Sequence, residues 1–168
     1  MTLLKLIILQ CFWYASIKYG QNLVLPIGGL FLFILDFLTF RKTKNLNINY
    51  LYFSLFLVLF GFGMDKLINY LSILEWGNQF YPTELIGVWL IFPCYYYHFF
   101  YKFQRTKWLP FLMGALFGPL AYYSGASISS NIILSDYTLS IILLGSIWGT
   151  FFWLSNLLYL YFEKRARR

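Results

Sequence analysis

The sequence predicts an all-α membrane protein, a polytopic bundle of six transmembrane helices with both termini in the cytoplasm. Hydrophobic residues make up 60% of the 168 positions and charged residues only 11%, too few to give a soluble domain a polar surface. The apolar residues form long runs separated by short polar or basic segments, and a spanning helix needs about 20 of them. We therefore expect a single integral membrane domain over residues 1–168.

Six segments are long and apolar enough to be helical spans. We expect the first to be retained, because bulky Gln10 precedes Cys11 where a lipoprotein signal has a small residue. The polar turn at 20–22 and the basic break at 41–45 separate the next segments, and residues 68–74 fit either a continued span or an interfacial segment. The predicted spans are residues 3–19, 23–40, 48–67, 84–103, 108–127 and 138–162.

The basic residues predict the orientation of these spans. Of 13 Lys and Arg residues, all except Lys18 and Lys66 fall on one side of a six-span arrangement. The positive-inside rule places that side, and both termini, in the cytoplasm. Because the basic residues cluster between apolar spans, we interpret the net charge of +7 as a topology signal and expect no nucleic-acid partner.

The stretch GALFGPLAYYSGA, residues 114–126, has the most specified residue choices in the chain. Its small residues recur at helical spacing, which allows another helix to approach closely in lipid. A GxxxG pair on the last span fits the same packing role. The predicted packing residues are Gly114, Gly118, Ala121, Gly125, Gly145 and Gly149.

Pro119 lies inside the same stretch and removes a backbone donor, which should free the carbonyl oxygen of Ala115. Tyr122 and Tyr123 follow, each with an apolar ring and a hydroxyl group. Two interpretations stay open. The stretch is either a tightly packed central helix with interfacial tyrosines, or it lines a ligand cavity.

Ionisable groups within spans are costly and therefore mark candidate sites. Asp65, near the end of the third span, is expected at a depth similar to that of Tyr122. A second hypothesis places His98, Asp36 and Asn156 at one depth in the cytoplasmic half, where they would hold the imidazole as a general base or proton relay. In the simpler alternative, Asp36 reaches a basic residue at 41 or 42 and His98 bonds a carbonyl.

No motif indicates a cofactor or metal. One histidine and two separated cysteines, Cys11 and Cys94, do not have the spacing of a ligand set. Phosphate loops, GxSxG elbows, HExxH and CxxC motifs are absent from the sequence. We expect no cofactor, no bound metal and no disulfide.

Several features together resemble a known family. They are Gln10 and Trp13, Asp65 after a Gly-containing third span, Trp89, Phe92 and His98 in the fourth, and the GAxxGPxAYxxG pattern at 114–125. In this combination and order the chain resembles a bacterial inner-membrane family known only as a domain of unknown function. The resemblance implies no established activity, although genes of such families tend to lie beside enzymes that modify lipid acyl chains.

The chain departs from that family where Glu84 replaces Trp and Tyr97 replaces Asn, and Asp36 has no counterpart. The resemblance thus favours His98, Asp65 and Tyr122 as candidate catalytic or polar residues.

Three functional hypotheses follow. In the first, the protein binds or helps modify a lipid or other hydrophobic molecule in a cavity lined by Pro119, Tyr122 and Trp89. In the second it is a transport component, such as a small-solute binding subunit, although the first span lacks an alanine-spaced docking motif. In the third it is a structural partner that docks another membrane protein through its glycines.

Overall fold

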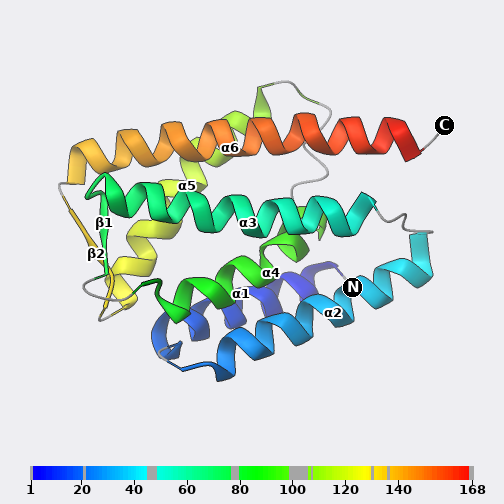
Figure 1. Cartoon of the computed structure of the whole chain (residues 1–168), viewed down its shortest axis with the longest axis horizontal. Helices are drawn as coiled ribbons and strands as arrows, with labels where there is room; N and C mark the ends of the chain where they lie inside the picture. The colour runs from blue at the N-terminus through cyan, green and yellow to red at the C-terminus, as the bar shows by residue number, and fades with distance from the viewer. Residues whose placement is uncertain are drawn as a thin grey trace. The chain divides into compact units, whose positions relative to one another are not determined.

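A computed structural model of the chain describes residues 2–20, 22–44, 49–76, 80–98, 106, 108–129, 131–135 and 137–166. These residues form six helices and two short strands, so the predicted six-helix, essentially all-α fold is confirmed. The elements are α1 (Thr2–Tyr19), α2 (Val24–Lys44), α3 (Asn49–Tyr70), β1 (Leu74–Glu75), α4 (Thr83–His98), α5 (Leu109–Ile128), β2 (Ile133–Leu134) and α6 (Tyr137–Ala166) (Figure 1).

Three of these helices are long and apolar enough to cross a membrane within the described part of the chain. They are Tyr50–Tyr70 in α3, Leu109–Ile128 in α5 and Thr138–Phe162 in α6. Val24–Thr39 in α2 is an apolar segment below that length. Residues 99–103, the end of the fourth predicted span, lie outside the described residues.

The helix α3 ends within residues 68–74, the segment that fits either a continued span or an interfacial segment. The helix continues to Tyr70, and the Ile73 amide then donates to the Ile68 carbonyl oxygen at 3.1 Å. Ser72 adopts a left-handed backbone conformation with φ of 54°. This six-to-one hydrogen bond with a left-handed residue is a helix-ending arrangement, and it turns the chain out of the helix before Leu74.

A small antiparallel ribbon follows this turn. β1 pairs with β2, with Leu74 opposite Leu134 and Glu75 opposite Ile133. The Asn69 side-chain amide donates to the Leu74 carbonyl oxygen at 2.8 Å, which fixes the ribbon to the end of α3. Strands of two residues are too short to produce a periodic sequence pattern, so the sequence did not predict them.

The chain forms two compact units. The first contains Met1–Phe62 and Tyr81–Tyr101, and the second contains Gly63–Phe80 and Lys102–Arg168. The boundary therefore falls inside α3, between Phe62 and Gly63.

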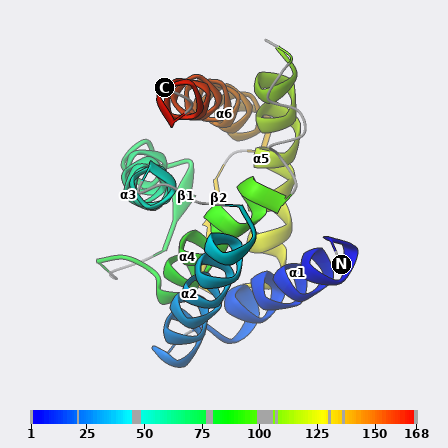
Figure 2. The same ribbon diagram turned by 90° about the vertical axis from the view of Figure 1, so that its right-hand side faces the viewer.

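In the first unit, α4 is the central helix. It packs against both α1 and α2, which run alongside it (Figure 2). A Cβ atom at Gly29 of α2 would lie 3.1 Å from the carbonyl oxygen of Gly87 in α4, so the two backbones approach closely. None of the described side chains of α4 is a large exposed hydrophobic group, whereas α1, α2 and α3 carry many.

An ion pair joins the first two helices. Lys5 Nζ lies 3.0 Å from Asp36 Oδ1, and the two side chains are 27% and 11% exposed. Lys5 is near the start of α1 and Asp36 is in the second half of α2, as expected for antiparallel neighbours. The simpler sequence hypothesis, which paired Asp36 with a basic residue at 41 or 42, did not consider this partner. The side chains of 41 and 42 lie outside the described residues.

We predict that Lys5→Met destabilises the protein more than the double substitution Lys5→Met with Asp36→Leu. The single change leaves a mostly buried carboxylate without its cation, which costs about 1.5–3 kcal/mol for a charged hydrogen bond of this kind. The double change removes both charges. Thermal unfolding in detergent measures the difference, and equal losses in both variants would contradict the prediction.

In the second unit, α5 and α6 form the most extensive helix pair, and β2 contacts α5. The glycines of both helices lie in their contact. A Cβ atom at Gly149 would lie 2.8 Å from the Phe111 ring, and one at Gly145 would lie 3.1 Å from the carbonyl oxygen of Ala115. A Cβ atom at Gly114 or Gly118 would overlap Trp148. The glycines thus allow α5 and α6 to pack at short range.

Candidate functional site

A buried hydrogen bond between α3 and α5 forms the centre of the candidate site. The Tyr122 hydroxyl donates to Asp65 Oδ1. Asp65 is fully buried, and Tyr122 is 9% exposed. The structure therefore brings together the two residues that the sequence placed at similar depth.

The helix ends explain why these two residues meet. Asp65 lies five residues before the end of α3, and Tyr122 lies six residues before the end of α5. At 1.5 Å per residue these positions are about 7.5 and 9 Å from the ends of their helices. The following ribbon connects the same two ends, because β1 follows α3 and β2 follows α5.

Trp148 of α6 completes the cluster. Its ring lies edge-on to that of Tyr122, with centroids 5.9 Å apart. Phe151 and Phe152 surround it, with centroids at 5.5 and 5.7 Å. Because Gly118 has no side chain, the indole fits against α5, and Gly114 leaves room for the backbone carbonyl of Trp148. We call Asp65, Tyr122 and Trp148 the Asp65 cluster.

The proline in α5 contributes to helix packing. Pro119 is buried, and the Ala115 carbonyl oxygen that it frees faces Gly145 of α6. Such a short approach of a carbonyl to a glycine is common at helix contacts. The freed acceptor is thus directed at a neighbouring helix.

The buried face of α5 differs in one position from the predicted stripe. Gly114, Gly118, Tyr122 and Gly125 are buried, whereas Ala121 is exposed. The buried face is displaced toward Pro119 and Tyr122, because their larger side chains occupy the contact, and Ala121 is left at its edge. Gly114 and Gly118 contact Trp148 of the same chain, so they offer no free surface for the docking of another protein.

The other predicted site residues belong to one or the other of the two units. Trp89 belongs to the first unit, where it is 2% exposed and packs against Gly61 of α3. Asp36 is paired with Lys5 in the same unit. His98 ends α4, and its side chain lies outside the described residues. Asn156 is in the second unit, buried on α6.

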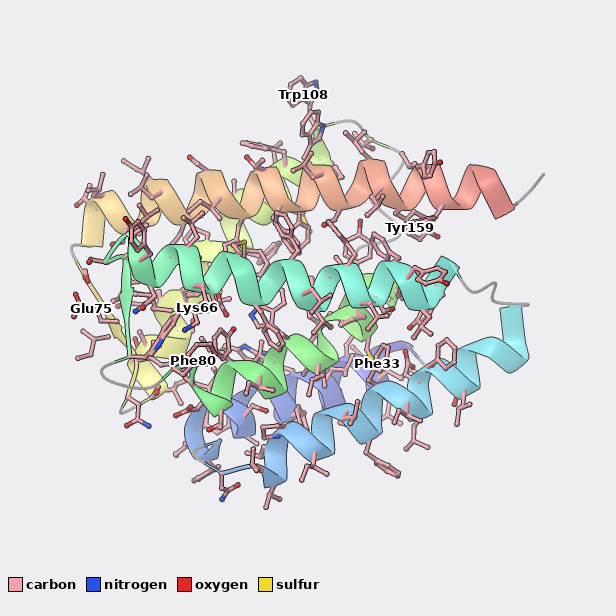
Figure 3. All side chains as sticks on the ribbon, viewed as in Figure 1. Phe33, Lys66, Glu75, Phe80, Trp108 and Tyr159 are labelled. Atoms are coloured by element: carbon pink, nitrogen blue, oxygen red, sulfur yellow. The ribbon has the colours of Figure 1, made fainter. Side chains whose placement is uncertain are left out.

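A second polar feature, which the sequence did not indicate, lies one residue beyond Asp65. Lys66 Nζ is 3.9 Å from the centroid of the Phe80 ring and 5.9 Å from that of Trp76. It also donates to the Phe80 carbonyl oxygen, and Figure 3 shows both side chains beside the end of α3. Phe80 itself is 87% exposed. A lone lysine in an apolar sequence gives no signal of such a cation–π contact.

The chemistry available to the Asp65 cluster is limited but definite. A carboxyl group and a tyrosine hydroxyl bind hydrogen-bond donors and cations, and the Trp148 ring supplies an aromatic wall. Among the residues that the structure describes, no group of three or more His, Cys, Asp or Glu side chains is placed to hold a metal. The cluster thus combines a hydrogen-bonded carboxyl group with an aromatic surface.

Comparison with known proteins agrees with the resemblance in one respect, which is membership of a family of unknown function. No curated protein and no solved structure matches the chain significantly. The family described as "Protein of unknown function (DUF2878)" matches residues 2–154, nearly the whole sequence. This chain is therefore a member of the DUF2878 family.

Proposed function

We propose that this chain is a multi-pass protein of the bacterial inner membrane that binds the polar end of a lipid or other hydrophobic molecule at the Asp65 cluster. In this proposal the chain crosses the membrane six times, with both termini in the cytoplasm. The single observation that carries the proposal is the fully buried Asp65 carboxyl group, hydrogen-bonded by Tyr122 between helices of membrane-spanning character.

The exposed surface supports placing α1 and α2 in the membrane with the three longer apolar helices. Their outward faces carry large apolar side chains that would be unfavourable in water. On α1 and α2 these are Leu3, Leu4, Ile7, Ile8, Val24, Ile27, Leu30, Phe31, Ile34, Leu35 and Leu38, each at least 43% exposed. Lipid is the solvent that makes such faces favourable.

Aromatic residues at the ends of the second unit fit membrane interfaces. Trp108, immediately before α5, is 70% exposed and points away from the helices (Figure 3). Tyr70 and Phe80, at the end of α3 and near its ribbon, are 85% and 87% exposed. The 20 residues of α5 span about 30 Å, the thickness of the hydrocarbon core.

The orientation has its own test. Fusing a fluorescent protein or an alkaline phosphatase to the C-terminus distinguishes the two sides of a bacterial inner membrane. We predict that the C-terminal fluorescent-protein fusion fluoresces and that the C-terminal phosphatase fusion is inactive. A phosphatase inserted after Gly77, on the opposite side of the membrane, should be active. An active phosphatase at the C-terminus would contradict the cytoplasmic placement.

The Asp65 carboxyl group, buried between apolar helices, needs a physical reason for its position. An ionisable side chain inside a membrane is expensive, and such residues usually mark a binding or transport pathway. A ligand with an ammonium or hydroxyl group would donate a further hydrogen bond to the carboxyl group, and its apolar portion would remain among helices. An amphiphilic ligand therefore fits both parts of the site.

We predict that wild-type protein, purified in mild detergent, retains a defined hydrophobic molecule that Tyr122→Phe loses. Native mass spectrometry with lipid analysis of the released ligand measures this retention. Removal of one hydrogen bond to the site should lower occupancy about tenfold. Tyr123→Phe is the matched control, because Tyr123 is the adjacent tyrosine and is 42% exposed.

Equal recovery of bulk phospholipid from all three proteins would overturn the proposed ligand site. Retention of a water-soluble small molecule by the wild type alone would instead support the second hypothesis, in which the protein is a transport component.

A further inference from the structure

Two consecutive residues of α6 each carry a buried oxygen atom without a hydrogen-bond partner among the residues that the structure describes. The two atoms are Ser155 Oγ and Asn156 Oδ1. Ser155 is fully buried, and Asn156 is 2% exposed. The Asp65 cluster involves neither of them.

Helical spacing places both residues on the packed face of α6. Ser155 follows Trp148 by seven residues, and Asn156 follows Gly149 by seven, so each repeats the position of a buried residue two turns earlier. Gly149 faces Phe111 of α5. About 10–12 Å of helix separates these oxygens from the level of Trp148, with Phe151 and Phe152 between them. They therefore form a place distinct from the Asp65 cluster.

The residue types indicate that a ligand binds at Ser155 and Asn156. Serine and asparagine are poorer helix formers than alanine or leucine, because their side chains compete for backbone hydrogen bonds. A buried acceptor that bonds nothing is unfavourable, and most such groups in native structures have a partner. Asn156 Oδ1 can only accept a hydrogen bond, and the Ser155 hydroxyl can accept as well as donate, so a partner that offers donors would satisfy both atoms.

The depth of these atoms indicates which part of a ligand reaches them. Asn156 precedes Glu163 by seven residues, and the basic C-terminal residues 164–168 follow at once. At 1.5 Å per residue, Asn156 lies about 10 Å from the start of that charged segment. Tyr159, one turn beyond Ser155 and partly exposed (Figure 3), lies on the same side of α6. In the proposed orientation this is the depth of the cytoplasmic leaflet.

We infer that Ser155 and Asn156 form a second site, which binds the headgroup of a cytoplasmic-leaflet lipid that carries hydrogen-bond donors. Ethanolamine and glycerol headgroups carry ammonium or hydroxyl donors, whereas a choline headgroup has none. The inference uses the proposed orientation of α6 but does not depend on a ligand at the Asp65 cluster.

Native mass spectrometry of delipidated protein tests this inference directly. The protein is incubated with an equimolar mixture of dioleoyl phosphatidylethanolamine, phosphatidylglycerol and phosphatidylcholine. We expect the wild type to bind one or both donor-bearing lipids about fivefold more than the choline lipid, as one additional net hydrogen bond would give. The relative binding of the first two lipids identifies the headgroup.

The variants Ser155→Ala and Asn156→Leu, singly and together, should abolish this preference. Ser146→Ala is the matched control on the same helix, because the exposed Ser146 hydroxyl already donates to the Ile142 carbonyl oxygen at 2.9 Å. It should keep the wild-type preference. Thermal unfolding of each variant shows that it is folded, and Ser155→Ala is mild enough to test the inference alone.

Equal binding of all three lipids by the wild type, or a preference that survives in the folded variants, would overturn the inference and indicate that internal water satisfies the two oxygens. Tyr122→Phe separates this result from the proposed function. If it loses the co-purified ligand but keeps the headgroup preference, the two sites are independent, as inferred.

Discussion

Replacing Gly118 with alanine is expected to destabilise the protein strongly, and replacing it with leucine is expected to prevent folding. The new Cβ atom would overlap the Trp148 side chain, and that ring is held by Tyr122, Phe151 and Phe152. Overpacking of this kind costs about 1–3 kcal/mol for one methyl group and more for a larger side chain. Thermal unfolding in detergent and the yield of monodisperse protein measure the effect.

Gly63 provides the matched control. It is also a helical glycine, on α3, but a Cβ atom there would meet nothing within 4 Å. Gly63→Ala should leave the stability unchanged or raise it by up to about 1 kcal/mol, because alanine is the better helix former. Equal stability of the Gly118→Ala and Gly63→Ala variants would contradict the packing of Trp148 directly against Gly118 of α5.

The second large effect is expected at the hydrogen bond of the Asp65 cluster. Tyr122→Phe removes the donor and leaves the fully buried Asp65 carboxyl group with one bond fewer. The expected cost is about 1.5–3 kcal/mol, the range for hydrogen bonds to charged groups. Asp65→Leu with Tyr122→Phe should recover part of that loss, because it removes both polar partners.

A double-mutant cycle in detergent separates the pair interaction from the single effects. We expect a coupling energy of about 1–3 kcal/mol between Asp65 and Tyr122. Additive effects of the two substitutions would show that the hydrogen bond contributes nothing to stability. Tyr123→Phe, on the exposed side of α5, serves again as the control.

The sequence predicted the helices well because run length and polar breaks determine them. Each of the six helices begins within one residue of a predicted segment, and the largest differences are at C-terminal ends, such as α2 and α6. Those ends are basic, and charge alone does not stop a helix. The β1–β2 ribbon depends on the left-handed Ser72 and on the Asn69 side chain, which no periodic pattern reveals.

The Asp65–Tyr122 contact could be predicted because it required only that the two residues lie at similar depth along their spans. Both residues lie near the ends of their predicted spans, residues 48–67 and 108–127, so counting residues within each span placed them at similar depth. The partner of Asp36 could not be predicted in the same way, because Lys5 is adjacent only if α1 and α2 are neighbours. Likewise, the contact of Trp148 with Tyr122 could not be predicted, because it depends on a small residue of another helix, Gly118.

The most direct test of the Asp65 cluster as a ligand site is photo-crosslinking with a lipid that carries a diazirine group near its headgroup. Peptide mass spectrometry then locates the modified residues. We predict modification beside Gly118, Tyr122 and Trp148 in the wild type, lost in Tyr122→Phe and kept in Tyr123→Phe. Modification confined to the outward residues of α5, such as Leu116 and Leu120 at 63% and 57% exposed, and unchanged in both variants, would contradict the proposed site.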